Sequence, residues 1–194
     1  MGYKNFIARA KRILQEQLDE TLTYHGYHHA EDVLKCVSAA TKRNKFGHHK
    51  TQLLKIAAFT HDIGYIDTYK GHETRGVEII SPILEEEGYT VEDIELISKW
   101  ILATNPDKKA KTLEEKIMKD ADLDYLGRAD FYDVAKTLFE EWVSKGIIAS
   151  DFNLFEKQEL HFLLDHKYLT EYARTYREPE KRKRIKELKQ KLKI

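Results

Sequence analysis

The sequence contains few of the residues that cross-link or interrupt a chain. It has one cysteine, Cys36, three prolines and nine glycines in 194 residues. A single cysteine excludes an intramolecular disulfide, and the scarcity of helix-breaking residues favours long helices. No apolar run reaches the length of a membrane-spanning helix, and the first residues lack the apolar stretch of a secretory signal. We therefore expect a cytoplasmic protein that does not act at a membrane.

Charge of one sign is not in excess, because 33 Lys or Arg residues balance 33 Asp or Glu residues. The chain as a whole therefore has no general attraction to nucleic acid or to an anionic membrane. Its length suits one domain with a sizeable core. We expect one helical domain over residues 1–178 and a distinct segment at 179–194.

The segment 179–194 is basic. It carries eight Lys or Arg residues and two Glu residues, so its net charge is +6 and that of residues 1–178 is −6. One interpretation is an electrostatic arm for nucleic acid or an acidic partner. We favour an amphipathic helix, because Ile185, Leu188 and Leu192 recur at spacings of three and four.

Apolar residues recur at helical spacings along most of the chain, which predicts an all-α fold. Thr90 begins one predicted helix with Asp93 three positions on, as in a capping box. We expect helices at about 5–21, 29–44, 50–63, 72–87, 91–104, 113–119, 130–145 and 153–175. Five aromatic residues lie on the apolar faces of the last two helices and are expected in the core: Phe131, Phe139, Trp142, Phe155 and Phe162.

Three short motifs carry candidate metal ligands. His61-Asp62, at the end of an apolar run, offers one nitrogen and one oxygen to the same divalent cation. Upstream, Gly26 places a loop-to-helix boundary after His25, so His29, which opens a predicted helix, is the better ligand. Downstream, three aspartates alternate over residues 120–124 and cannot share one helix face, so we expect only Asp122 to point inward.

The order His29, His61-Asp62 and Asp122 on a helical chain resembles the HD-domain superfamily of metal-dependent phosphohydrolases. The resemblance covers about residues 20–130 and includes further stretches: Tyr24-His25 with Asp32-Val33, the run from Ala57 to Gly64, His72-Glu73 with Gly76, and Asp120-Ala121-Asp122-Leu123 with Leu126-Gly127. It implies a helical bundle of the HD type. It is specific for the superfamily and does not name a substrate.

The resemblance implies that His29, His61, Asp62 and Asp122 hold one divalent metal ion. Mn, Fe, Zn, Ni, Co and Mg are the candidate metals. A water bound to such an ion is acidic enough to provide hydroxide near neutral pH. The implied activity is hydrolysis of a phosphate ester or anhydride in a nucleotide-like small molecule. His25, by resemblance to the phosphodiesterase branch, would donate a proton to the leaving oxygen.

The sequence departs from the family pattern at two places. Members with two metals carry further histidines; His72 matches the first, but the later position falls in residues 101–105, which contain none. We therefore expect at most a weaker second metal at His72, or a phosphate-facing imidazole. Some members have an acidic residue where Tyr65 stands here, and Asp67 is the nearest carboxylate that would orient the water.

Three cations are candidates for binding phosphate oxygens: Lys70, Arg75 and Arg128. Tyr65, Tyr69 and Tyr125 are candidates for stacking on a substrate. Two other functions stay open. The incomplete second site and Tyr65 would also suit a non-catalytic nucleotide-binding regulator, and the basic segment would suit a nucleic-acid-binding protein, which the balanced charge makes the least favoured.

Overall fold

The computed structural model describes residues 2–194, and all regular structure in that range is helical. The described residues form two compact units, one ending at Asp122 and the other Leu123–Ile194. The all-α prediction is confirmed. The basic segment 179–194 belongs to the second unit together with residues 123–178; that residues 1–178 act as one domain stays a prediction. Among the described residues, none of the helices is long and apolar enough to cross a membrane.

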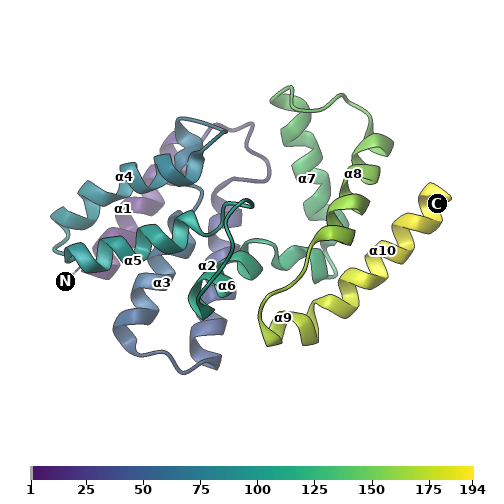
Figure 1. The fold of residues 1–194 in the computed structure, drawn as a ribbon. Helices are drawn as coiled ribbons and strands as arrows, with labels where there is room; N and C mark the ends of the chain where they lie inside the picture. Colours follow the sequence, from purple (N-terminus) through teal and green to yellow (C-terminus); the bar gives the residue numbers. More distant parts are fainter. Residues whose placement is uncertain (1) are drawn as a thin grey trace. The chain divides into compact units, whose positions relative to one another are not determined.

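The first unit contains six α-helices and one 3-10 helix among its described residues (Figure 1). Their bounds are α1 Gly2–Gln17, α2 Tyr27–Arg43, α3 His48–Thr60, η1 Ile63–Ile66, α4 His72–Glu86, α5 Val91–Leu102 and α6 Leu113–Asp122. Thr90 caps α5 as predicted, because its side chain accepts a hydrogen bond from the backbone N–H of Asp93.

Helix α3 is the central helix of this unit and packs against α1, α2 and α5. Every residue from Ile56 to Thr60 is buried, as expected for a helix with apolar or small residues on all faces. Ala57 and Ala58 are fully buried and allow neighbouring helices to approach closely. Because α3 ends inside the unit, His61 and Asp62 follow it into the interior, with only 0% and 7% exposure.

After Asp62, the 3-10 helix η1 packs directly on the start of α4. Gly64 makes this possible: a Cβ there would lie 1.9 Å from the carbonyl oxygen of His72 and 2.7 Å from the backbone nitrogen of Gly76. Gly71, which precedes α4, has φ 76°, in the left-handed region that glycine adopts freely. These two glycines bring the first turn of α4 against the His61-Asp62 segment.

The second unit contains η2 Asp124–Gly127, α7 Phe131–Ser144, α8 Phe152–Asp165, α9 Glu171–Tyr176 and α10 Glu178–Leu192. Helix α10 packs against α8, α9 and η2. Leu188 is buried, and so are two basic residues of the segment 179–194, Lys181 at 2% and Arg184 at 9% exposure. Arg177 joins η2 to this helix, because its guanidinium donates to both carboxylate oxygens of Asp124 at 2.7 and 3.0 Å.

The helix predicted over 153–175 is wrong in its second half. Helix α8 ends at Asp165, and His166 is extended, with φ −64° and ψ 137°. The chain leaves the helix to bury Tyr168, whose hydroxyl donates to the carbonyl oxygen of Leu123 at 3.2 Å. Thr170 then caps α9. The prediction for Phe162 is also wrong, since this side chain is 42% exposed, whereas Phe131 and Phe155 are in the core as expected.

Candidate metal centre

Four side chains from three helix ends meet in the first unit. His29 lies in the first turn of α2, His61 and Asp62 follow the last turn of α3, and Asp122 is the last residue of α6. One nitrogen or oxygen of each residue lies within 4.8 Å of those of the other three. The structure therefore brings together all four residues that the sequence indicated as metal ligands.

The two imidazoles face the two carboxylates at short distances. Nε2 of His29 lies 3.0 Å from Oδ1 of Asp122 and 3.5 Å from Oδ2 of Asp62. Nε2 of His61 lies 3.2 and 3.1 Å from the same two oxygens. Nδ1 of His61 is 2.9 Å from the carbonyl oxygen of Ala58, and donating its proton there directs Nε2 at the cluster. Two nitrogens and two oxygens thus converge on one point.

The pKa values show how strongly these groups interact. Burial lowers the pKa of His61, but the charge of Asp62 and hydrogen bonds to Asp122 and Asp62 outweigh burial and raise it well above its usual range. Burial raises the pKa of Asp122, but hydrogen bonds from His29 and His61 lower it far more. In the absence of a cation, the imidazole of His61 therefore keeps its proton beside the two carboxylates. A divalent cation would take the place of this proton.

The donor set fits a metal ion on a second observation. Oδ2 of Asp62 is buried and lies 3.1 and 3.5 Å from Nε2 of His61 and of His29, but among the described residues no donor is aligned well enough to satisfy it by hydrogen-bond geometry. An unsatisfied buried carboxylate oxygen is costly unless another partner binds it. A cation among two imidazoles and two carboxylates satisfies it, and this combination of ligands suits Mn, Fe, Zn, Co or Ni.

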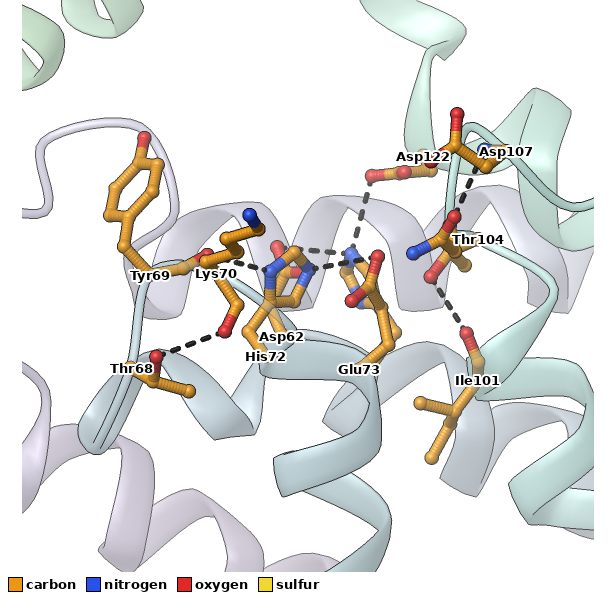
Figure 2. A network of polar contacts seen from close by, with 12 residues as sticks. Asp62, Thr68, Tyr69, Lys70, His72, Glu73, Ile101, Thr104, Asp107 and Asp122 are labelled. Atoms are coloured by element: carbon orange, nitrogen blue, oxygen red, sulfur yellow. Dashed lines mark hydrogen bonds and ion pairs between the residues drawn. The ribbon is translucent and has the colours of Figure 1, made fainter. Parts of the chain in front are cut away.

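His72 lies beside the cluster on the first turn of α4 (Figure 2). Its Nε2 is 3.4 Å from Oδ1 of Asp62, the oxygen that does not face His29 and His61. Its Nδ1 lies 3.3 Å from the carbonyl oxygen of Tyr69. Burial lowers the pKa of His72, but the hydrogen bond to Asp62 and the charge of Asp62 raise it above its usual value. The two oxygens of Asp62 thus contact imidazoles on two sides.

His25 lies close to the cluster but outside it. Its ring centroid is 6.1 Å from that of His29 and 6.5 Å from that of His72. Tyr65 stacks on His25, with 4.3 Å between ring centroids, and on His72, with 4.0 Å. Tyr65 therefore replaces the expected acidic residue with a ring that packs on both imidazoles.

Other candidates contact different groups. Nε of Arg75 binds Oδ2 of Asp67 at 2.6 Å, and both side chains are more than 40% exposed. Arg75 also binds Glu78. Lys70 is exposed near His72, whereas Arg128 lies in the second unit and pairs with Asp130 at 2.7 Å. The predicted role of Asp67, to orient a water, and the predicted role of the three cations, to bind phosphate, stay predictions.

The expectation that only one of the three aspartates points inward is wrong. Asp120 and Asp124 are buried at 6% and 7% exposure, and Asp124 binds Arg177. Asp124 follows the end of α6 and lies in η2 of the second unit, where it binds Arg177, so its burial does not depend on the helix face that Asp122 uses. Asp122 is the one that contacts His29 and His61.

Two residues near the cluster were not predicted as site residues from the sequence. Glu73 is 4% exposed, and its Oε1 lies 3.8 Å from Nε2 of His72. Lys119 donates to the carbonyl oxygen of Asn105 at 2.6 Å, and burial lowers its pKa although the charge of Asp122 raises it. Glu73 had a sequence signal, because it directly follows His72 in a stretch that resembles the family. Lys119 had none.

The model of the HD domain matches residues 26–124 of the chain. The protein belongs to the HD-domain family. The matched region contains all four residues of the cluster and His72, and His25 lies immediately before it. HD-domain proteins are generally metal-dependent hydrolases, and the His-Asp cluster of this HD domain is able to hold a metal ion. No curated protein matches the chain.

Proposed function

We propose that this HD-domain protein is a metal-dependent phosphohydrolase that acts on a phosphate ester or anhydride of a nucleotide-like small molecule. The observation that carries the proposal is the convergence of His29, His61, Asp62 and Asp122 within 4.8 Å in a chain of this family. A divalent ion held there would acidify a water and neutralise negative charge on phosphoryl oxygens. A cytoplasmic location is part of the same proposal.

The residues around the cluster suit this chemistry. His25 is half-buried and stacks on Tyr65, so its ring is held with its centroid 6.1 Å from that of His29 and 6.5 Å from that of His72. From there it would donate a proton to the leaving oxygen. His72 faces the free side of Asp62 and would either bind a second, weaker metal or contact the phosphate. Lys70, exposed beside His72, would assist in binding phosphate.

The deciding experiment combines metal analysis with a phosphate-release screen. Purified protein is assayed on nucleotides and cyclic nucleotides with Mn, Mg, Co, Ni and Zn supplied separately. We expect about one tightly bound metal per chain and turnover of a subset of substrates. Asp62→Ala should lose both metal and turnover, whereas His25→Ala should keep the metal and lose about 10²-fold or more in rate. Asp165→Ala, which removes an exposed carboxylate at the end of α8, is the control.

Full activity of a metal-free Asp62→Ala protein would contradict the hydrolase. The second candidate is a non-catalytic nucleotide-binding regulator on the same fold. It is favoured by one observation, the ring of Tyr65 where an acidic residue would orient the water. Bound metal and nucleotide binding without turnover of any substrate in the screen would support the regulator. A third candidate, nucleic-acid binding by the basic segment, is weakened because Lys181 and Arg184 are buried.

A further inference from the structure

A groove of about 660 Å³ lies in the first unit along α4 and α5. The two helices pack on each other and are joined by a short connection, so the start of α4 lies at the same end as the end of α5 (Figure 1). At that end the groove is lined by Glu73, Thr74, Leu102 and Ala103, and by four residues of the following segment, Asn105, Lys108, Lys109 and Lys111. At the other end it is lined by Glu85, Val91, Ile94 and Glu95.

The first of these ends lies next to the metal centre. Glu73 lines the groove, and its carboxylate is 3.8 Å from His72, which in turn is 3.4 Å from Asp62. Figure 2 shows Glu73 with His72 on one side and Thr104 on the other. Lys119, one turn of α6 before Asp122, holds the carbonyl oxygen of Asn105, another lining residue. A ligand whose phosphate reached the cluster could therefore extend past Glu73 into the groove.

The groove carries positive charge at this end. Lys108, Lys109 and Lys111 line it, are exposed and form no ion pair within residues 2–194. Lys99 differs, because it pairs with the buried carboxylate of Glu115 at 3.3 Å. Of the other carboxylates of the lining, Glu85 and Glu95 are at the far end, whereas Glu73, at this end, is 4% exposed and lies 3.8 Å from Nε2 of His72. Three unpaired ammonium groups beside a concave surface attract anions.

The backbone that carries these lysines is held at both ends. Asn105 accepts hydrogen bonds from the backbone of Asp107 and Lys108, at 2.9 and 3.1 Å. At the other end, the carboxylate of Glu115 accepts from the backbone nitrogens of Lys111 and Thr112. The three lysines therefore project from a segment whose position is fixed against α5 and α6, which lowers the entropic cost of using them to bind a ligand.

We propose that the groove binds a second phosphate group of the substrate, separated from the phosphate that is hydrolysed at the cluster. The inference rests on the proposed function and narrows its substrate class to molecules with two separated phosphate groups. The lysines at positions 108, 109 and 111 contact the second phosphate, and the aliphatic side chain of Leu102 contacts the uncharged part between the two.

The test measures binding by calorimetry with manganese present. Two probe pairs are compared: adenosine 3′,5′-bisphosphate with adenosine 5′-monophosphate, and hexanediol bisphosphate with hexyl phosphate. The triple variant Lys108→Gln/Lys109→Gln/Lys111→Gln removes the three charges. The matched control, Lys4→Gln/Lys35→Gln/Lys42→Gln, removes three exposed charges of the same unit that do not line the groove. Metal content is measured for every protein.

We expect one bisphosphate to bind about tenfold or more tightly than its monophosphate partner, the effect of one or two charge-assisted contacts. The groove variant should lose this preference and keep its metal, and the control should retain both. The proposal is overturned if neither bisphosphate is preferred or if the groove variant keeps the preference. If the protein prefers a bisphosphate but turns over no substrate, the result would count against the proposed hydrolase activity and would still support phosphate binding in the groove. Failure of the proposed activity and failure of the groove assignment are therefore distinguishable.

Discussion

The ring of Tyr65 stacks on the ring of His72, with 4.0 Å between centroids and 19° between planes. The same ring stacks on His25 at 4.3 Å and 26°. One phenol ring therefore packs on the imidazole that would protonate the leaving group and on the imidazole that contacts Asp62. Each such aromatic pair contributes about 0.5–1.5 kcal/mol beyond the burial of its area.

Replacing Tyr65 tests whether this stacking positions His25. Tyr65→Leu removes both aromatic contacts and should lower kcat about tenfold, with a smaller change in KM, because His25 is no longer held in place. Tyr65→Phe keeps the stacked ring and should retain most of the rate. Steady-state kinetics with metal content measured in parallel would check this. A Leu variant as fast as the parent would show that the stacking has no catalytic effect.

Gly64→Ala should damage both stability and the site. The added Cβ would lie 1.9 Å from the carbonyl oxygen of His72, so the first turn of α4 has to move away from Asp62. We expect a loss of about 2 kcal/mol or more in the free energy of unfolding, measured with urea, and weaker metal binding. At Gly47 a Cβ would meet nothing within 4 Å, so Gly47→Ala should change stability by less than about 1 kcal/mol.

Removal of metal should lower the melting temperature. The carboxylates of Asp62 and Asp122 lose their cation, and at about a hundredfold excess over Kd the bound ion contributes roughly 2.7 kcal/mol. Scanning fluorimetry with EDTA and with added manganese would measure the difference. In Asp122→Ala the difference should shrink strongly. If neither EDTA nor manganese changes the melting temperature of the parent protein, the result would contradict a metal centre of this kind.

We expect the stability of the second unit to depend on pH through Glu159, which is far in sequence from the cluster. Burial raises its pKa from 4.5 to about 7, and its Oε2 has no hydrogen-bond partner among the described residues. Between these two pKa values the folded chain binds more protons than the unfolded chain, so the contribution of Glu159 to stability falls as pH rises from about 4.5 to 7. The total change is of the order of 3 kcal/mol.

The matched variant is Glu159→Gln, which keeps the shape and cannot ionise. Urea unfolding at about pH 5 and pH 8 should show the variant gaining roughly 2–3 kcal/mol relative to the parent at the higher pH. His166 acts in the opposite direction, since burial and then Lys181 lower its pKa to about 4. Its contribution to stability rises with pH between about 4 and 6.5 and is present in both proteins, so it cancels in the comparison.

Much of the fold was predictable because apolar spacing reports which face of a helix is buried. The helices of the first unit lie within a few residues of the predicted ranges. The failures occurred where a distant contact decides the local conformation. The chain leaves the helix at His166, and Tyr168 is buried with its hydroxyl donating to the carbonyl oxygen of Leu123. The sequence of residues 153–175 does not indicate this distant partner.

The candidate ligands were indicated by residue chemistry and order, and the structure brings them together. The surroundings of the cluster were not predictable in the same way. Tyr65 was considered as a substrate-stacking residue, but its two imidazole neighbours come from the segments before α2 and at the start of α4. The ion pair between Asp67 and Arg75 likewise depends on the close packing of η1 on α4, which Gly64 permits.

The positions of the helix ends also polarise the site. His61 is the first residue after α3, Asp122 is the last residue of α6, and His72 is the first residue of α4. Helix C-termini carry about half a negative charge and N-termini about half a positive charge. The C-terminal ends of α3 and α6 therefore lie at the cluster, and so do the N-terminal ends of α2 and α4, because His29 is in the first turn of α2. Negative and positive helix ends lie side by side there, so a cation and an anion bound together would each lie near helix ends of the opposite sign.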